Sequence, residues 1–359
     1  NQQKQQRKNM KNIIKTAIVM LASLSIFASA NAGELSVTGT AKATINSNGG
    51  NDTGKGLGVA NEFDLTASGE LDNGFTWKYQ VQMDPNANAQ ENDDSRLEVT
   101  TPYGMLGIYS MEGGLDVEDG ASQSVYGRPT DIGDPSATVD NFTIDSYNNV
   151  QYHTPADLLP FSTVLKVAYA PTLDATQNSA NAGGAVHTPS ATSMGSSAME
   201  YQLSFAPVDA LAVKASYIEF QDAGSNTVTA LNNNFSQSPS SGALSAVYTI
   251  GSTKVGASRG IRDNLLDAAT FAGTEIRGYE QDNVSISHLF NDNLSLSYEI
   301  EKSEQIAIDS SQVEIEQKSQ SIQAAYTMGG MTLALVMADH DNNGYVDGVN
   351  ATQTLLAVT

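Results

Sequence analysis

The sequence lacks cysteine throughout its 359 residues, which excludes disulfide scaffolds, thiolate metal sites and cysteine nucleophiles. Positive charge is also scarce, because 18 Lys and Arg stand against 40 Asp and Glu and leave a formal net charge of −22. Proteins that bind nucleic acid grip the phosphate backbone with clustered Lys and Arg. The composition therefore excludes nucleic acid as a partner. Charged residues make up only 16% of the chain, below the roughly 25% of an average soluble domain.

Long hydrophobic runs are missing except near the amino terminus. Lys11 and Lys15 precede an apolar run from Ala17 to Phe27, which leads to the small-residue site Ala30-Asn31-Ala32. A positive start, a short apolar stretch and an A-x-A site are typical of a secretory signal peptide. A membrane-spanning helix needs about 20 apolar residues, more than this run offers. The sequence thus predicts an exported protein.

Two segments follow from that interpretation. Residues 1–32 are predicted to be an upstream extension plus the signal peptide, with cleavage after Ala32, and residues 33–359 to be one β-barrel domain. The first segment holds five of the positive charges and none of the negative ones, so the mature chain carries 13 positive and 40 negative charges, a net −27. Without another long apolar run, any membrane must be entered as strands.

Apolar and polar residues alternate over most of the mature chain. In Leu294–Ile300 (LSLSYEI), leucine, tyrosine and isoleucine occupy one parity, and serine and glutamate the other. Period two places one face of a strand in an apolar medium and the other in a polar one. A soluble β-sandwich shows the same pattern, so the alternation alone leaves both architectures open.

The lengths of the connections favour a membrane barrel. Short connections with turn-forming residues are predicted at 72–74, 101–104, 156–160, 207–210, 251–252, 291–293 and 328–330. Between them lie eight longer polar stretches, at about 46–58, 84–94, 111–145, 171–198, 221–240, 260–277, 303–312 and 339–351. Seven short and eight long connections in strict alternation imply sixteen strands. An outer-membrane barrel has short periplasmic turns and long extracellular loops, whereas a sandwich has no reason to keep its long loops at one end.

Two segments resemble the general porins of Gram-negative bacteria. Residues 147–155 (YNNVQYHTP) are similar to the strand and turn that follow the constriction loop in that family, and 103–109 (YGMLGIY) to the segment before it. The resemblance implies a sixteen-stranded antiparallel barrel in the outer membrane, usually a homotrimer, whose third long loop folds into the pore. Members normally end in an aromatic residue, whereas this sequence stops at Ala357-Val358-Thr359, so we expect a truncated carboxy terminus.

The third long loop is predicted to carry negative charge and the barrel wall facing it to carry positive charge. The predicted constriction loop carries the acids Glu112, Asp116, Glu118, Asp119, Asp131 and Asp134. Parity places these bases on lumen-facing sides of their strands: Lys42, Lys78, Arg96, Lys166, Lys214 and Lys254. Acids facing bases would create a transverse field in a water-filled constriction and set ion preference. Alternatively, the bases are scattered lumen residues and the acids belong to an ordinary solvated loop.

A calcium-loop pattern, D-x-[DN]-x-[DN]-G, occurs in the last long connection. Asp339, Asp341, Asn343 and Asp347 would supply oxygen ligands for Ca²⁺. The twelfth position, however, is Asn350 in place of the usual glutamate. A plain hairpin loop rich in Asp, Asn and Gly is the alternative explanation. No other cofactor is predicted.

Catalytic patterns are missing from the sequence. The four histidines are isolated, and no nucleophile elbow accompanies the serines. We therefore predict a channel and not an enzyme: an outer-membrane porin for passive diffusion of ions and small hydrophilic solutes, with outer-membrane lipid around it. The alternative is a secreted or surface-exposed β-rich adhesin or binding protein without a pore.

Overall fold

The structure is a computed structural model that describes residues 33–51, 53–86, 89–132, 138–173, 194–222, 237–264, 276–308 and 313–359. Within these ranges the chain forms sixteen strands and four short 3-10 helices. The strands are β1 (Glu34–Gly50), β2 (Gly54–Glu70), β3 (Thr76–Asn86), β4 (Ala89–Thr101), β5 (Gly104–Ser110), β6 (Asn149–His153), β7 (Val164–Ala170), β8 (Ser197–Val208), β9 (Leu211–Gln221), β10 (Ser240–Ile250), β11 (Thr253–Asp263), β12 (Ile276–Leu289), β13 (Leu294–Ala307), β14 (Glu316–Met328), β15 (Met331–Asp341) and β16 (Ala351–Val358). The 3-10 helices are η1 (Asp119–Ala121), η2 (Ile144–Ser146), η3 (Pro160–Ser162) and η4 (Asn343–Tyr345).

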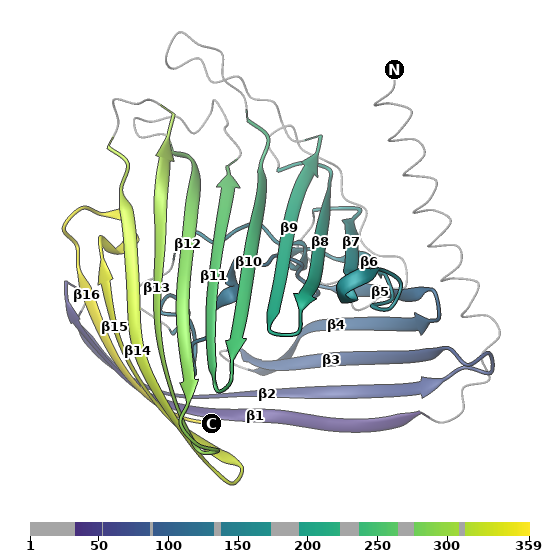
Figure 1. Cartoon of the computed structure of the whole chain (residues 1–359), viewed down its shortest axis with the longest axis horizontal. Helices are drawn as coiled ribbons and strands as arrows, with labels where there is room; N and C mark the ends of the chain where they lie inside the picture. Colours follow the sequence, from purple (N-terminus) through teal and green to yellow (C-terminus); the bar gives the residue numbers. More distant parts are fainter. Residues whose placement is uncertain are drawn as a thin grey trace.

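The strands form one closed antiparallel barrel in chain order (Figure 1). The first and last strands complete it, with β1 and β16 paired from Ala43 opposite Val358 to Gly50 opposite Ala351. The predicted fold of sixteen antiparallel strands is confirmed. No helix in the described ranges is long and apolar enough to cross a bilayer.

All seven predicted short connections fall between paired strands. Four of them contain a glycine with positive φ, namely Gly74 at 79°, Gly104 at 127°, Gly251 at 58° and Gly329 at 60°. Residues with a Cβ adopt this backbone conformation only at a steric cost, so glycine suits these positions. The turn chemistry in the sequence therefore located the short end of the barrel correctly.

Two of the predicted long loops are wrong. The stretch at 46–58 lies mostly in β1 and β2. These two strands are paired all the way from Glu34 opposite Ser68 to Asn48 opposite Gly54. Similarly, β3 and β4 pair as far as Asn86 opposite Ala89, within the stretch predicted as a loop at 84–94. Polar and glycine-rich residues lack the apolar alternation of a strand, but their backbones still complete an antiparallel ladder.

The barrel buries polar side chains and exposes apolar ones. On β12, Asn283 and Ser285 point inward and are buried, whereas Val284 and Ile286 are 56% and 45% exposed on the outer face. The same alternation continues on β13 and β14, where Glu299 and Ser319 are buried and Tyr298 and Ile322 are exposed. This is the reverse of a soluble protein and matches a wall with lipid outside and a polar lumen inside.

Candidate pore constriction

The connection between β5 and β6, residues 111–148, is called the inner loop below, because its described residues lie inside the barrel. Of this segment, residues 111–132 and 138–148 are described. The backbone N–H groups of Leu115 and Ile144 donate to Glu200 Oε2 on β8, over 3.3 and 2.8 Å. At the other end, Gln353 Nε2 on β16 donates to the carbonyl oxygen of Ile132 over 3.0 Å. The inner loop therefore follows the inner wall from β8 to β16.

Two apolar clusters fix the inner loop to this wall. The first packs Leu115 and Ile144 against inward residues of β7, β8 and β9, and the second packs Ile132 against β14, β15 and β16. Many wall residues in both clusters are alanine, which leaves room for the loop. The closest approach is at Gly256 on β11, where a Cβ would lie 1.8 Å from the carbonyl oxygen of Ala121. Only glycine fits at that point.

Wall carboxylates accept hydrogen bonds from the middle of the inner loop. Ser122 Oγ donates to Glu299 Oε2 over 2.6 Å, and Ser124 Oγ donates to the same oxygen. Thr130 Oγ1 donates to Glu301 Oε2, also over 2.6 Å. Hydrogen bonds to ionised acceptors are stronger than neutral ones. These wall acids were not among the predicted site residues, because the predicted acids all lie in loops.

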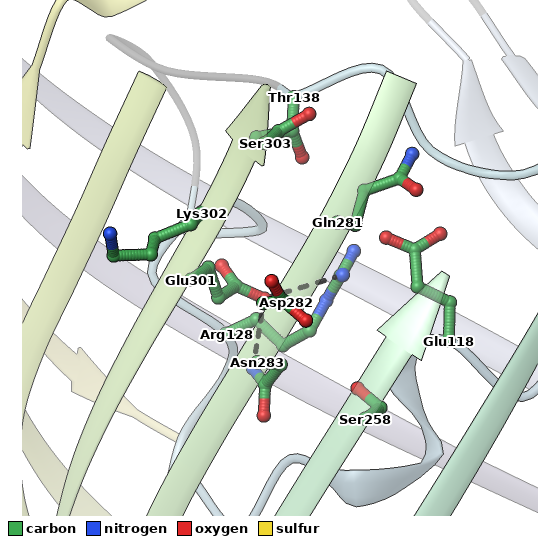
Figure 2. Close-up of a pocket in the computed structure, with 10 residues that line it drawn as sticks. All are labelled: Glu118, Arg128, Thr138, Ser258, Gln281, Asp282, Asn283, Glu301, Lys302 and Ser303. Atoms are coloured by element: carbon green, nitrogen blue, oxygen red, sulfur yellow. Dashed lines mark hydrogen bonds and ion pairs between the residues drawn. The ribbon is translucent and has the colours of Figure 1, made fainter. Parts of the chain in front are cut away.

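Arg128 connects the acids of the inner loop with those of the wall. Its Nε and Nη2 donate to Asp131 over 2.7 and 3.0 Å. Its Nη1 contacts Asp119 and lies 3.3 Å from Glu301 Oε1, and Nη2 lies 3.6 Å from Asp140 Oδ1. Figure 2 shows this guanidinium within the polar pocket, with Glu301 joined to Arg128 and Asn283. Arg128 was not among the predicted site residues, although it is the one basic residue of the inner loop.

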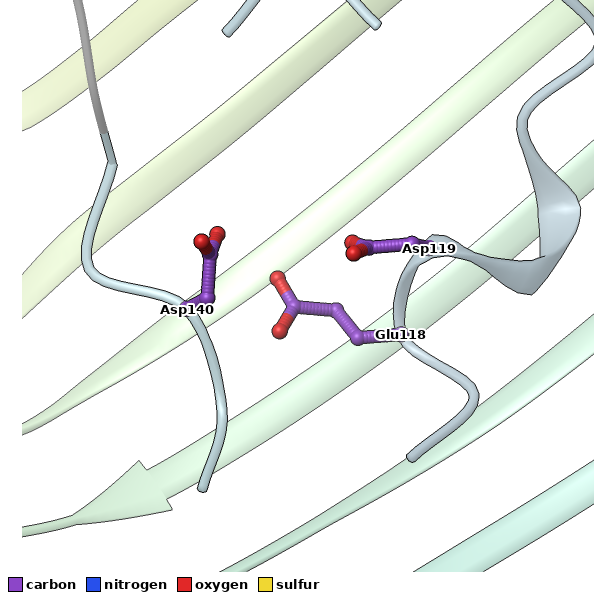
Figure 3. Close-up of side chains that lie close together, drawn as sticks. All are labelled: Glu118, Asp119 and Asp140. Atoms are coloured by element: carbon purple, nitrogen blue, oxygen red, sulfur yellow. The ribbon is translucent and has the colours of Figure 1, made fainter. Parts of the chain in front are cut away.

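Three acids of the inner loop converge beside Arg128. Ligand oxygens of Glu118, Asp119 and Asp140 all lie within 4.8 Å of one another, and Figure 3 shows the Glu118 carboxylate between the other two. Glu118 is buried and accepts a hydrogen bond from the backbone N–H of Asn141 over 2.9 Å. Burial raises the pKa of Glu118 to about 9, and nearby acids add to that effect. The Asp119 side chain is 51% exposed, but the surrounding loop removes part of its water and raises its pKa to about 7, although Arg128 opposes the shift.

The other predicted loop acids have different surroundings. Glu112 forms an ion pair with Arg96 of the wall, with 2.6 Å between Oε1 and Nη1. Asp116 accepts a hydrogen bond from Ser216 Oγ on β9 over 3.0 Å. Asp131 binds Arg128, as described above, and Asp134 lies outside the described residues. The predicted acids thus divide into a converging group and two that contact the wall separately.

The predicted wall bases lie at several places on the inner face. Lys42 Nζ on β1 lies 5.0 Å from the ring centroid of Tyr126 of the inner loop. Arg96 on β4 is held by Glu112, and the charge of Lys78 on β3 also acts on that acid. The remaining three, Lys166 on β7, Lys214 on β9 and Lys254 on β11, are on other strands, and the first two repel each other electrostatically. The six bases therefore do not form one cluster, and their role in the pore stays a prediction.

The predicted calcium ligands do not form a compact group. Asp339 and Asp341 lie on the outward face of β15, on either side of the inward, buried His340. Asn343 belongs to η4, and Asp347 follows it in the connection to β16. Among the described residues, the carboxylates that converge as a trio are those of Glu118, Asp119 and Asp140. Calcium binding at the outer connection stays a prediction.

Known proteins share this architecture. A family model described as Gram-negative porin matches residues 16–359, while no curated protein matches the sequence. Similar solved structures include Salmonella typhi OmpF in complex with daunomycin, at 12% identity and a TM-score of 0.64, covering 93% of this chain and 100% of that chain. The anion-selective porin from Comamonas acidovorans is 11% identical, with a TM-score of 0.57 and coverage of 90% and 99%. OmpT of Vibrio cholerae in its trimer form is 14% identical, with a TM-score of 0.55 and coverage of 91% and 99%. At these identities the likeness is one of fold.

Proposed function

Because the chain belongs to the Gram-negative porin family, we propose that its inner loop selects among permeating solutes, with a weak preference for cations. The protein is located in the outer membrane, where it forms a channel for passive diffusion of solutes. Family and fold indicate a channel and not an enzyme. The proposal accordingly involves no catalytic step and no cofactor turnover.

The exposed acids of the inner loop carry the proposal. The side chains of Asp119, Asp131 and Asp140 are 51%, 52% and 52% exposed, although the polypeptide around them is packed against the barrel wall. Carboxylates at a narrowing raise the local concentration of cations and lower that of anions. The mature chain's excess of acids acts in the same direction.

Contact between loop and wall limits the strength of the predicted transverse field. The pair Glu112–Arg96 brings one acid and one base together, so these two charges largely cancel at a distance. Lys42 and Lys78 have no carboxylate within 4.0 Å among the described residues, so their charges still oppose the acids of the inner loop. We therefore propose a moderate field between β1–β3 and the inner loop, which orients dipolar solutes.

Assembly and export are part of the proposal. OmpT, one of the matched porins, is described in a trimer form, and we propose a homotrimer here as well. On β2 the outward-facing Leu57 and Val59 are 81% and 78% exposed, a surface that suits either a second copy or lipid. We also propose that residues 1–32 are removed on export and that small hydrophilic solutes and ions are the cargo.

Reversal potentials across a planar bilayer in a salt gradient test the proposed selectivity. The parent channel should pass cations in preference to anions, and the triple variant Asp119→Asn, Asp131→Asn, Asp140→Asn should lose that preference. A matched control neutralises three acids that point outward from the barrel, with Glu280→Gln, Asp282→Asn and Glu304→Gln, and should keep it. Clear anion preference in the parent would refute the proposal.

A further inference from the structure

We propose that the carboxylates of Glu118, Asp119 and Asp140 bind one divalent cation on the inner loop, with Ca²⁺ as the ion whose chemistry fits best. The three residues come from two separate parts of the loop, on either side of residues 133–137 (Figure 3). A shared ion would therefore tie both parts together.

The charges around this trio are not balanced by the protein. Three further acids, Asp116, Asp131 and Glu301, interact electrostatically with the trio or with Arg128. The facing cations are Arg128, and Arg262, whose Nη1 donates to the carbonyl oxygen of Asp140. Lys302 and Asp282 also line the pocket, but they are paired with Glu316 and Arg259 and are left out of the balance. Six carboxylates against two guanidinium groups leave a formal excess of four negative charges. A divalent cation would remove half of that excess.

Glu118 is the member with the least compensation. Its exposed fraction is 6%, and no Lys, Arg or His nitrogen lies within 4.0 Å of its carboxylate among the residues that the structure describes. The donors of Arg128 are instead directed to Asp119, Asp131, Asp140 and Glu301. An isolated buried carboxylate is unfavourable, so it must take up either a proton or a metal ion.

Unpartnered oxygens beside Glu118 favour the metal ion. Ser258 Oγ and Gln281 Oε1 line the same pocket as Glu118 (Figure 2), and both are buried without a hydrogen-bond partner. Ser258 is 8% exposed and Gln281 5%. The amide nitrogen of Gln281 donates to the carbonyl oxygen of Val139 over 2.7 Å. This hydrogen bond fixes the amide group so that its oxygen Oε1 points away from Val139.

The Gln281 oxygen is close to the Glu118 side chain. A Cβ at Gly260 would lie 3.0 Å from Gln281 Oε1 and 3.1 Å from Glu118 Cγ, so these two atoms are at most 6.1 Å apart. The Gln281 oxygen, which has no hydrogen-bond donor directed at it, therefore lies beside the Glu118 side chain and is available to a cation held there. Carboxylate, amide and hydroxyl oxygens without nitrogen or sulfur ligands are the donor set of a hard ion such as Ca²⁺.

Isothermal titration of the EDTA-treated channel in detergent with CaCl₂ tests this inference. The parent should show one saturable site per chain that weakens as pH falls from 8 to 5, because protons compete for the same carboxylates. Glu118→Gln should weaken binding by at least about tenfold, because ligand charge sets Ca²⁺ affinity. Asp140→Asn, which removes an exposed loop acid and leaves the strands unchanged, should also weaken binding and serves if Glu118→Gln does not fold.

Two control variants separate the alternatives. Asp292→Asn in the short turn between β12 and β13 removes the same charge far from the inner loop and should bind like the parent. Asp341→Asn should also bind like the parent, and selective loss in that variant would move the site to the outer connection and overturn the inference. No Ca²⁺ binding at any pH in a chain that conducts would show that Glu118 takes up a proton instead. That outcome would overturn this inference but not the proposed selectivity, which rests on reversal potentials.

Discussion

Arg128 of the inner loop and Glu301 of β13 form a buried ion pair, with 3.3 Å between Nη1 and Oε1 and with side chains that are 9% and 7% exposed. Thr130 Oγ1 and Asn283 Nδ2 also donate to the Glu301 carboxylate. Because water cannot replace a lost partner at this depth, each charge depends on the other. The pair therefore holds the middle of the inner loop against the wall.

Arg128→Gln should destabilise the protein by about 3 kcal/mol, because it leaves several acids without a counter-charge. The inner loop should also loosen and increase the noise of the open-channel current. Denaturant unfolding in detergent and single-channel recordings measure the two effects. Arg259→Gln is the matched control, because Arg259 pairs with Glu280 near the end of β12 that follows the long connection, where the two side chains are 55% and 37% exposed. Ion pairs that water can reach contribute about 0–1 kcal/mol. Equal losses in the two variants would contradict the role given to Arg128.

Cation preference should rise with pH between about 6 and 9. Over this range Asp119, with a pKa of about 7, and Glu118, with a pKa of about 9, become ionised and make the inner loop more negative. Reversal potentials recorded in EDTA at stepped pH measure the rise. Glu118→Gln should remove the part of the rise in cation preference that occurs near pH 9. If the rise is unchanged in this variant, other groups cause it.

The same shift makes stability depend on pH. Burial raises the pKa of Glu118 from 4.5 to about 9, so the folded chain keeps a proton that the unfolded chain has released. The free energy of unfolding should therefore fall as pH rises from about 4.5 to 9 and level off above that. Unfolding midpoints of the parent and of Glu118→Gln, measured without divalent ions, should converge toward pH 4.5. Parallel curves across the range would contradict the shift.

Lys78→Gln should increase cation preference more than Arg96→Gln does at pH 6. Lys78 has no carboxylate within 4.0 Å among the described residues, so its loss removes an uncompensated positive charge. Loss of Arg96 leaves Glu112 without its ion-pair partner, and because burial raises the pKa of that carboxyl, uptake of a proton offsets part of the change. Reversal potentials of both variants over a pH series test this, since the difference between the two variants should shrink as pH rises.

Val284→Arg should destabilise the barrel by about 2–4 kcal/mol, because it places a charge on the lipid-facing side of β12. Ser287→Arg adds the same side chain on the inner face of the same strand and should cost much less. Unfolding in lipid vesicles compares the two variants. A larger loss for Ser287→Arg would reverse the assignment of the two faces.

The strand content was predictable because period two and turn chemistry are local properties. In Leu294–Ile300 the alternation of apolar and polar residues distinguishes the two faces of the strand. The short turns contain glycines with positive φ, a conformation that other residues rarely adopt. The tips of the first two hairpins were not predictable in this way. Backbone pairing there extends as far as Gly54 and Asn86, and side-chain polarity carries no information about it.

The arrangement of the candidate site was only partly predictable. The inner loop was located from its length and its acids, and the pair Glu112–Arg96 joins a predicted acid to a predicted base. Its contacts with Glu200, Glu299 and Gln353 join residues far apart in the sequence, so no local pattern indicates them. Arg128 offered one signal, since it is a lone base among many acids.

The hydrogen bond from Gln353 to Ile132 spans 221 positions of the chain. Ile132 also packs against β14, β15 and β16, so this end of the inner loop cannot reach its final position before the last three strands are in place. Because closing so long a stretch of chain is entropically costly, we expect this contact to form slowly. The width of the passage in the finished barrel would thus depend on the final strands of the chain.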